Sequence, residues 1–312
     1  MRALVLTALL GLMFSPPPPG AALVPSRAAA QDGDRGQYTI AVDVELVIFN
    51  VSITDDKGRL VAGLKAGDFQ IREQGLLQTI KSFTADDVPA TVGLIIDNSG
   101  SMRERYTDVV NAALVFASAS HSEDEMFVVN FNENVYLGLP PSTKFTSERA
   151  QLRSALLSNA PDGLTALYDA LALGINHLKA GTRERKALVV LSDGGDNSSR
   201  QSLDGVLEIA KRSNATIYTI GIYDETNLDK NPRVLRRIAD LGGGRAYFPD
   251  SVRDVERVWR DIAGEIRSQY TIGYHSSNPT RDGLFRKVEI NAGRNRRVLA
   301  RDGYFAPTPV AK

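Results

Sequence analysis

The pattern of hydrophobic and polar positions divides the chain into a β-rich segment, a segment of alternating strands and helices, and a second β-rich segment. In residues 38–83 the apolar positions first fall on even-numbered residues, from Ile40 to Ile48, and then on odd-numbered ones, from Val47 to Ile53. Such alternation predicts half-buried strands. A change of phase inside one run indicates a bulge, or a strand that passes from one sheet to another. Further short strands are expected at residues 69–73 and 76–83.

The middle segment has a different pattern. Continuous apolar runs at residues 91–96, 126–131 and 187–191 predict strands that are buried on both faces. Helical spacing predicts helices at residues 109–119, 147–157, 166–178, 203–213, 233–241 and 252–266, and further strands are expected at 135–139 and 216–222. Strands that alternate with helices at this spacing predict an α/β fold, with a doubly wound, mostly parallel sheet covered on both faces.

The last segment returns to strands, which are expected at residues 270–275, 286–291 and 298–301. Neither β-rich segment has enough strands to bury a core alone. We therefore predict that the two segments pair into one β-sandwich, in which the α/β domain is inserted. The alternative is two separate β appendages. The predicted parts are an N-terminal sandwich half at 37–86, the α/β domain at 89–266 and a C-terminal sandwich half at 269–307.

The first thirty residues have the features of a signal peptide. An apolar run at residues 3–14 follows Arg2, four prolines follow that run, and Ala28-Ala29-Ala30 forms a small-residue cleavage signature, with cleavage after Ala22 as an alternative. The run is too short for a permanent membrane helix, and no later segment predicts one. We expect a signal peptide at 1–30 and an exported bacterial protein, periplasmic or secreted. The alternative is a disordered N-terminus with a chance apolar patch.

Composition narrows the chemistry. The chain has 312 residues, with 37 Lys and Arg against 37 Asp and Glu, and no cysteine. A net charge of zero gives no field that attracts nucleic acid, so no nucleic-acid partner is expected. The absence of cysteine excludes disulfides, a thiol nucleophile and cysteine-ligated metals. The histidines at 121, 177 and 275 lack metal-ligand spacing, so any metal should be held by oxygen.

Oxygen-bearing side chains lie on three predicted loops at one edge of this sheet. Asp97, Ser99 and Ser101 follow the first strand of the α/β segment in a D-x-S-x-S pattern. Asp193 follows the third of the buried runs, and Thr165 opens a helix. In an open α/β sheet the ligand crevice lies beyond the carboxyl ends of the strands. The five side chains can therefore converge there.

Two carboxylates and three hydroxyls suit a small hard cation, Mg²⁺ first and Mn²⁺ or Ca²⁺ as alternatives. Because only two of these ligands are anionic, the ion remains an electrophile that can take one more anionic oxygen from outside. The alternative for single residues is helix capping: Ser101 could cap the helix after Arg103, and Thr165 the helix after Ala166.

The five positions resemble the metal-ion-dependent adhesion site of the von Willebrand factor type A domain, which uses D-x-S-x-S, a threonine and an aspartate on three loops. The resemblance implies that Ser99 and Ser101 ligate the metal directly and that Thr165 does so directly or through water. It implies that Asp97 and Asp193 act largely through bound water. It also implies a binding module and not an enzyme, in which the cation takes an Asp or Glu carboxylate of a partner protein.

The flanking segments resemble exported bacterial proteins that are related to the same domain. The shared patterns are Val61-x-x-Leu64, Asp68-Phe69 and Glu73-x-Gly75 near the N-terminus, and Tyr270, Gly273-Tyr274 and Gly303-Tyr304 near the C-terminus. One departure is Gly195-Asp196-Asn197 after Asp193, where we expect Asp196 to be a solvated loop residue. We likewise expect the arginine cluster at residues 294–301 to form a solvated face.

Two other functions remain open from the sequence. The first is a Mg²⁺-dependent phosphoester hydrolase with Asp97 as nucleophile, although a second carboxylate for acid/base work is missing. The second is an accessory subunit of a cytoplasmic ATPase, a role that related domains play. A serine hydrolase is excluded, because the chain has no G-x-S-x-G elbow with a histidine partner.

Overall fold

The computed structural model describes residues 45–158, 160–223 and 230–308. The signal peptide predicted for residues 1–30 lies outside the described residues, as do the alternating positions before residue 45. All described residues belong to one compact unit that spans residues 43–312. None of the helices in the described ranges is long and apolar enough to cross a membrane.

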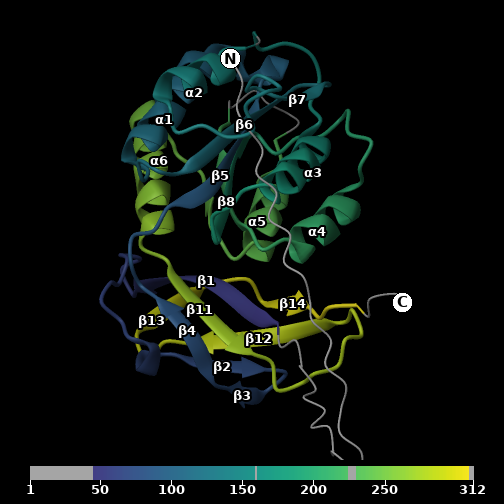
Figure 1. The fold of residues 1–312 in the computed structure, drawn as a ribbon. Helices are drawn as coiled ribbons and strands as arrows, with labels where there is room; N and C mark the ends of the chain where they lie inside the picture. Colours follow the sequence, from purple (N-terminus) through teal and green to yellow (C-terminus); the bar gives the residue numbers. More distant parts are fainter. Residues whose placement is uncertain (1–44, 159, 224–229, 309–312) are drawn as a thin grey trace, which may run out of the picture. The chain divides into compact units, whose positions relative to one another are not determined.

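A six-stranded sheet forms the centre of the α/β part, with the strand order β10-β9-β8-β5-β6-β7 (Figure 1). Its strands are β5 (Ala90–Asp97), β6 (Glu125–Phe131), β7 (Val135–Leu137), β8 (Arg185–Ser192), β9 (Thr216–Gly221) and β10 (Ala246–Tyr247). Neighbouring strands pair in parallel, except that β7 pairs antiparallel with β6. Every residue of β5 is buried, which explains its uninterrupted apolar run.

Helices cover both faces of this sheet. They are α1 (Tyr106–Ala119), α2 (Arg149–Leu156), α3 (Leu167–Leu178), α4 (Leu203–Arg212), α5 (Pro232–Leu241) and α6 (Val252–Arg267), with a 3₁₀ turn, η2, at Gly100–Arg105. Figure 1 shows α1 and α6 on one face and α3, α4 and α5 on the other. On the first face the rings of Phe116 and Trp259 pack with centroids 5.3 Å apart. The predicted doubly wound, mostly parallel sheet is confirmed.

The two β-rich segments form two four-stranded sheets, with the orders β13-β1-β11-β4 and β14-β12-β2-β3. The strands are β1 (Leu46–Asp55), β2 (Gln70–Glu73), β3 (Leu76–Gln78), β4 (Ile80–Thr84), β11 (Tyr270–His275), β12 (Phe285–Asn291), β13 (Arg296–Leu299) and β14 (Gly303–Phe305), with a 3₁₀ turn at Ala66–Asp68. Each sheet contains strands from both ends of the chain. The segments therefore form one sandwich, and the alternative of two separate appendages is wrong.

The strand β1 changes its pairing along its length. Its first half pairs with β11 from Leu46 to Val51, and its second half pairs with β13 from Ser52 to Asp55. The side chains of residues 51–54 are all buried, so strict alternation fails where one partner replaces the other. The phase change in the sequence lies earlier, at residues 46–48, where β1 still pairs with β11, so the change of partner does not explain it.

One predicted strand is wrong, and two short strands were missed. Residues 76–83, expected to form one strand, are divided between β3 and β4, which belong to different sheets. A single residue, Thr79, separates these strands, so no run of turn residues marks the change of sheet. The strands β10 and β14 were not expected, because two or three residues are too few to show a periodic pattern.

The expectation of a solvated arginine cluster at residues 294–301 is wrong for Arg301. Its guanidinium lies 4.5 Å from the ring centroid of Phe49 and donates hydrogen bonds of 2.6 Å to Asn214 Oδ1 and to the carbonyl of Ile48. Burial disfavours the cation and lowers the pKa of Arg301 to about 10. The segments that cover this side chain lie far away in the sequence.

Arg185, the first residue of β8, binds both connections between the sandwich and the α/β part. The side chain is buried and donates to the carbonyl oxygens of Asp86 (2.8 Å), Arg267 (3.0 Å) and Gln269 (2.6 Å). Asp86 lies in the connection that enters β5, Arg267 is the last residue of α6, and Gln269 lies in the connection that leaves α6. One guanidinium thus holds the entry and the exit of the inserted domain.

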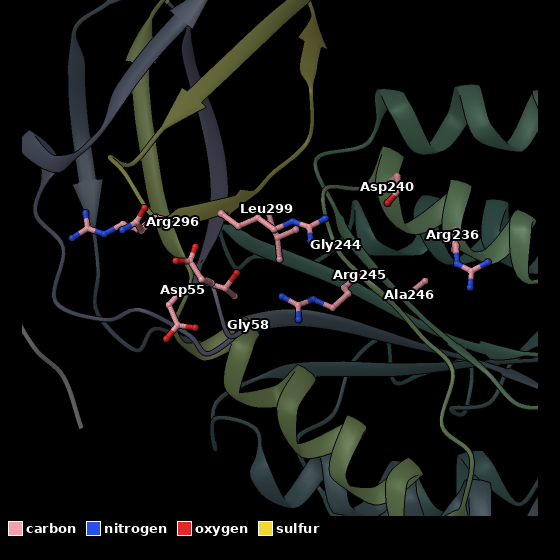
Figure 2. Close-up of a pocket in the computed structure, with 13 residues that line it drawn as sticks. Asp55, Gly58, Arg236, Asp240, Gly244, Arg245, Ala246, Arg296 and Leu299 are labelled. Carbon is pink, nitrogen blue, oxygen red and sulfur yellow. The ribbon is translucent and has the colours of Figure 1, made fainter.

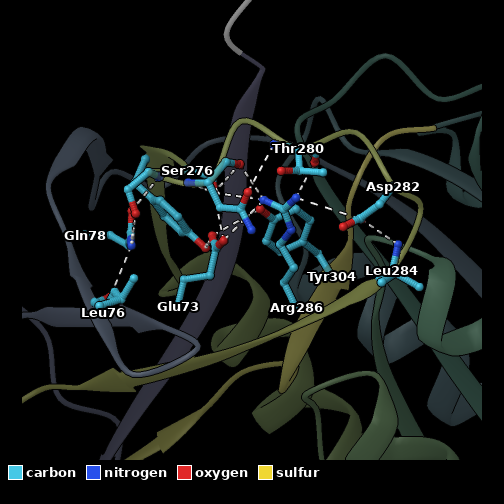
Figure 3. A network of polar contacts seen from close by, with 12 residues as sticks. Glu73, Leu76, Gln78, Ser276, Thr280, Asp282, Leu284, Arg286 and Tyr304 are labelled. Carbon is cyan, nitrogen blue, oxygen red and sulfur yellow. Dashed lines mark hydrogen bonds and ion pairs between the residues drawn. The ribbon is translucent and has the colours of Figure 1, made fainter. Parts of the chain in front are cut away.

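Glu73 links the N-terminal and C-terminal strands inside the sandwich (Figure 3). This buried carboxylate on β2 accepts hydrogen bonds from Tyr274 Oη (3.0 Å), Tyr304 Oη (3.1 Å) and Ser276 Oγ (2.7 Å). It also pairs with Arg286 Nη1 at 3.4 Å, and both side chains of this pair are at most 3% exposed. All four partners come from the C-terminal segment, so the network joins the two halves.

We expect Glu73→Ala to lower the free energy of unfolding by about 3–5 kcal/mol, because it removes the buried carboxylate that pairs with Arg286. Among the described residues this leaves the guanidinium only Asp282, at 3.9 Å. Urea denaturation measures this change. The matched control is Glu289→Ala on β12, whose ion pair with Lys287 is solvent-exposed and should affect the midpoint little. Equal effects of the two substitutions would contradict the role assigned to Glu73.

Candidate metal centre

The sheet topology places the ends of β5 and β8 at a switch point. From β5 the chain moves to β6 on one side and later returns to β8 on the other side, and β5 and β8 are hydrogen-bonded neighbours. Crevices at such points, beyond the carboxyl ends of the strands, are where open α/β sheets bind ligands. Asp97 is the last residue of β5, and Asp193 directly follows β8.

Two hydrogen-bonded pairs whose hydroxyl oxygens lie close together bring four of the five predicted site residues into one place. The backbone N and the hydroxyl of Ser99 donate to Asp97 Oδ1 at 2.9 and 2.5 Å. The hydroxyls of Ser99 and Ser101 lie 3.1 Å apart, and Ser101 Oγ donates to Asp193 Oδ2 at 2.8 Å. The D-x-S-x-S turn therefore places one hydroxyl against each of the two carboxylates.

The fifth residue, Thr165, lies on a loop that is hydrogen-bonded to this turn through the backbone. Gly100 N donates to the carbonyl of Gly163 at 3.1 Å. Gly163 has a φ of +80°, and a Cβ there would lie 1.8 Å from a carboxylate oxygen of Glu133. Glu133 Oε2 accepts a hydrogen bond from Leu164 N at 3.0 Å. A side chain at position 163 would thus collide with the group that holds the threonine loop.

The capping alternative finds no support in the structure. The 3₁₀ turn η2 begins after Ser99 and α1 after Arg105, and neither capping residue makes a side-chain capping hydrogen bond. The capping position of α3 is Ala166 and not Thr165. The hydroxyls of Ser101 and Thr165 are therefore not used as N-caps.

The electrostatics of the site disfavour two free carboxylates. Asp97 is fully buried, and Asp193 is 2% exposed. Burial, together with the nearby Asp193 charge, raises the pKa of Asp97 to about 7, although hydrogen bonds from Ser192 and Ser99 act in the opposite direction. A cation held between these oxygens would favour the ionised form of both. The donor set therefore fits a small hard cation.

The set contains few anionic groups. Among the residues that the structure describes, no group of three or more Asp, Glu or His side chains could hold a metal ion. A cation here would depend on Ser99, Ser101 and Thr165 beside the two aspartates. Ser101 is the exposed member of the set, while the other four are buried. The site therefore opens to solvent on the side of Ser101.

Several supporting residues were not predicted. Ser192 Oγ donates to Asp97 Oδ2 at 2.6 Å, and Asn197 Oδ1 accepts from Thr165 N at 2.9 Å. Asp196, expected to be a solvated loop residue, instead accepts from Tyr168 N at 3.0 Å and from Ser199 Oγ at 2.6 Å. It therefore joins the loop after β8 to the start of α3. The only sequence signal was the run of polar residues after Asp193.

The model of the von Willebrand factor type A domain matches residues 92–260, more than half of the chain. The uncharacterized protein sll0103 of Synechocystis sp. is 25% identical over 186 residues, with 57% of this chain and 43% of that protein covered. The uncharacterized protein YfbK of Escherichia coli is 23% identical over 191 residues, with 57% and 32% covered. The match spans less than half of either relative.

Among solved structures, a von Willebrand factor type A protein from Catenulispora acidiphila has a TM-score of 0.52 and 17% identity. The similarity covers 85% of this chain and 75% of that one. At this level of identity the likeness shows a shared fold and nothing about ligands.

We expect Mg²⁺ or Mn²⁺ to stabilise the protein, by about 2.7 kcal/mol when the free ion is about a hundredfold above its Kd. Asp97→Asn should abolish this effect, because it removes one of two carboxylates. In metal-free buffer the same variant should be at least as stable as the wild type, because it removes a buried charge beside Asp193. Thermal unfolding with and without the ions measures both effects.

The matched control is Asp204→Asn on α4, an exposed position that should keep the full response to the ions. Absence of any ion-dependent shift or titration heat in the wild-type protein would contradict the metal site. A shift of equal size in the Asp97 variant would show that the ions bind elsewhere.

Proposed function

Because the chain belongs to the von Willebrand factor type A family, we propose that it is a metal-dependent protein-binding module. In this proposal Asp97, Ser99, Ser101, Thr165 and Asp193 hold a divalent cation, and an Asp or Glu carboxylate of a partner protein completes the coordination. The observation that carries the proposal lies at the switch point of the sheet. Ser99 donates to Asp97, Ser101 donates to Asp193, and the two hydroxyl oxygens lie 3.1 Å apart.

The chemistry of the proposed contact follows from the donor set. When bound, the cation supplies an electrophile for a carboxylate oxygen, and with only two aspartates around it part of its positive charge is not neutralised. The backbone and hydroxyl bonds from Ser99 to Asp97 fix the turn. The exposure of Ser101 gives a partner side chain access.

The threonine loop supports a role in recognition. Leu164, next to Thr165, is 53% exposed, although its backbone N is fixed by Glu133. Near it, Arg103 pairs with Asp162 at 2.8 Å, and both side chains are exposed. A partner that brings its carboxylate to the site would meet an apolar side chain and an ion pair, which supply selectivity at the rim.

Two observations favour recognition over phosphoester hydrolysis. Asp97, the candidate nucleophile, is fully buried, and each of its carboxylate oxygens accepts a hydroxyl hydrogen bond. Both oxygens of Asp193 are also engaged, by Ser101 Oγ and by Gly195 N. A nucleophile needs an accessible lone pair aimed at the substrate. The hydrogen bonds that these carboxylates accept hold the loops of the site in place and leave neither carboxylate exposed to a substrate.

We expect affinity capture from the source organism to retain a partner in Mg²⁺ and to lose it on chelation and with Asp97→Ala as bait. Asp204→Ala is the matched bait, which should keep the partner. Replacement of exposed acidic residues of the captured protein, one at a time, should identify one carboxylate whose loss abolishes binding. The same set of proteins under every condition would contradict the proposed function.

Export is a separate part of the proposal and rests on the sequence of residues 1–30. The protein recovered from cells should begin after Ala30 or Ala22, which N-terminal sequencing of the periplasmic and secreted fractions determines. An intact N-terminus in the cytoplasmic fraction would contradict export and favour the accessory ATPase role.

A further inference from the structure

The sandwich and the α/β part border a shared cleft of about 830 Å³ (Figure 2). Its walls include the turn after β1 and the loop that leads into β10. Since β10 is parallel to β9, its first residue, Ala246, lies at the amino edge of the sheet. The metal centre lies at the carboxyl edge, and none of its five residues lines this cleft. We therefore look within the α/β part for the contacts that position its loops.

The helix α3, which follows Thr165, has no capping side chain of its own. Its N-cap residue is Ala166, which makes no side-chain capping hydrogen bond. An N-cap side chain ordinarily accepts a hydrogen bond from the second or third backbone N–H group of its helix. In α3, which begins at Leu167, these groups belong to Tyr168 and Asp169. They need acceptors from elsewhere.

The loop after β8 supplies both acceptors. Tyr168 N donates to Asp196 Oδ2 at 3.0 Å, and Asp169 N donates to Ser199 Oγ at 3.1 Å. Ser199 Oγ in turn donates to Asp196 Oδ2 at 2.6 Å, so the two acceptors hold each other. The carboxylate also lies at the positive end of the helix dipole, where a negative charge is stabilising. Asp196 and Ser199 therefore cap α3 from a distant part of the sequence.

The helix holds the same loop in return. The carboxylate of Asp169 accepts hydrogen bonds from Arg200 N and Gln201 N, both at 2.9 Å. These residues directly precede Ser202, the N-cap of α4. The first turn of α3 and the loop between β8 and α4 thus cap and fix each other.

The backbone of Thr165 is bound to this loop through both of its polar groups. Thr165 N donates to Asn197 Oδ1 at 2.9 Å. Its carbonyl accepts from Asn197 N and Ser198 N, both at 3.0 Å. The side chain is 7% exposed, and among the described residues its hydroxyl has no hydrogen-bond partner. The hydroxyl therefore remains available to a cation.

We propose that Asp196 is a positioning residue of the metal centre and acts through Thr165, without touching the cation. This inference rests on the metal-binding part of the proposed function. Thr165 directly precedes the N-cap of α3, so its hydroxyl is the local acceptor to which the N–H groups of the first turn turn when the cap is lost. The cap from Asp196 satisfies these groups and leaves the Thr165 hydroxyl for the cation.

The test is isothermal titration calorimetry of the metal-free full chain with Mg²⁺ and Mn²⁺. Asp196→Ala should weaken binding about tenfold or more, the loss typical of residues that orient metal ligands. Asp196→Asn keeps an oxygen acceptor for Tyr168 N and should bind the ions nearly as tightly as the wild type. Equal losses in the two variants would show that the charge of Asp196 acts and not its cap, and would overturn the proposal.

A double-mutant cycle with Thr165→Ala tests whether Asp196 acts through Thr165. Residues that act through one another have non-additive effects. The variant with both Asp196→Ala and Thr165→Ala should therefore bind the ions no more weakly than Thr165→Ala alone. Losses that add up, or wild-type affinity in Thr165→Ala, would overturn the proposal.

The matched control is Ser251→Ala, which removes a cap from a helix outside the site. Ser251 is the N-cap of α6, and its Oγ accepts from Asp254 N at 3.2 Å. This variant should lower the melting temperature by a few degrees, as Asp196→Ala should, but leave the affinity for the ions unchanged. An equal loss of affinity in the control would show a general effect of lower stability and would overturn the proposal.

Amide hydrogen exchange without metal measures the cap itself. The N–H groups of Tyr168 and Asp169 should exchange faster in Asp196→Ala than in the wild type, and equal rates would contradict the cap. Wild-type affinity in Asp196→Ala would overturn the positioning role and leave the proposed function intact. A wild type that binds the ions but no partner would contradict the proposed function and leave the positioning role intact. A wild type that binds neither ion would contradict both.

Discussion

The lateral pairing of β5 with β8 is the constraint on which the candidate site depends. Parallel pairing of these two strands requires their carboxyl ends to lie side by side. Asp97 ends β5, and Asp193 directly follows β8. Two carboxylates are thus brought together where water is excluded. The hydroxyls of Ser99, Ser101 and Ser192 partly compensate by hydrogen bonding, but they bring no positive charge. This arrangement supports the proposal that a cation binds between the two carboxylates.

The sequence predicted those parts of the fold in which burial leaves a periodic or continuous signal. The run in β5 identified a strand covered on both faces, and the alternation from Val47 to Ile53 identified the strand β1. The division of residues 76–83 between β3 and β4 could not be predicted, because only Thr79 separates two strands whose partners lie far apart in the chain. Arg301 was assigned to the surface for a similar reason, since the residues that cover it are distant in sequence.

The candidate site could be predicted in part because its central motif is local. D-x-S-x-S places two hydroxyls near one aspartate within five residues. The end of a strand supplied the position of Asp193, and the start of a helix supplied that of Thr165. The groups that hold these loops were missed: Glu133 and Asn197 act across more than thirty residues of sequence on backbone N–H groups. Any residue can offer a backbone N–H group, so such contacts leave no trace in residue type. Whether the five residues hold a metal remains a prediction, and the geometry is consistent with it.

The guanidinium of Arg185 holds the connection into β5 and the connection out of α6 together. The entry and exit points of the inserted domain are thereby neighbours. For the strands of the sandwich, the inserted domain therefore occupies the place that a short loop would occupy. Domains whose ends lie close together can be exchanged between hosts without displacing the host strands. The sandwich could therefore accept a different inserted domain. Another α/β domain with a similar distance between its termini could replace residues 89–266. It would have to supply a buried cation for the carbonyl oxygens that Arg185 now satisfies.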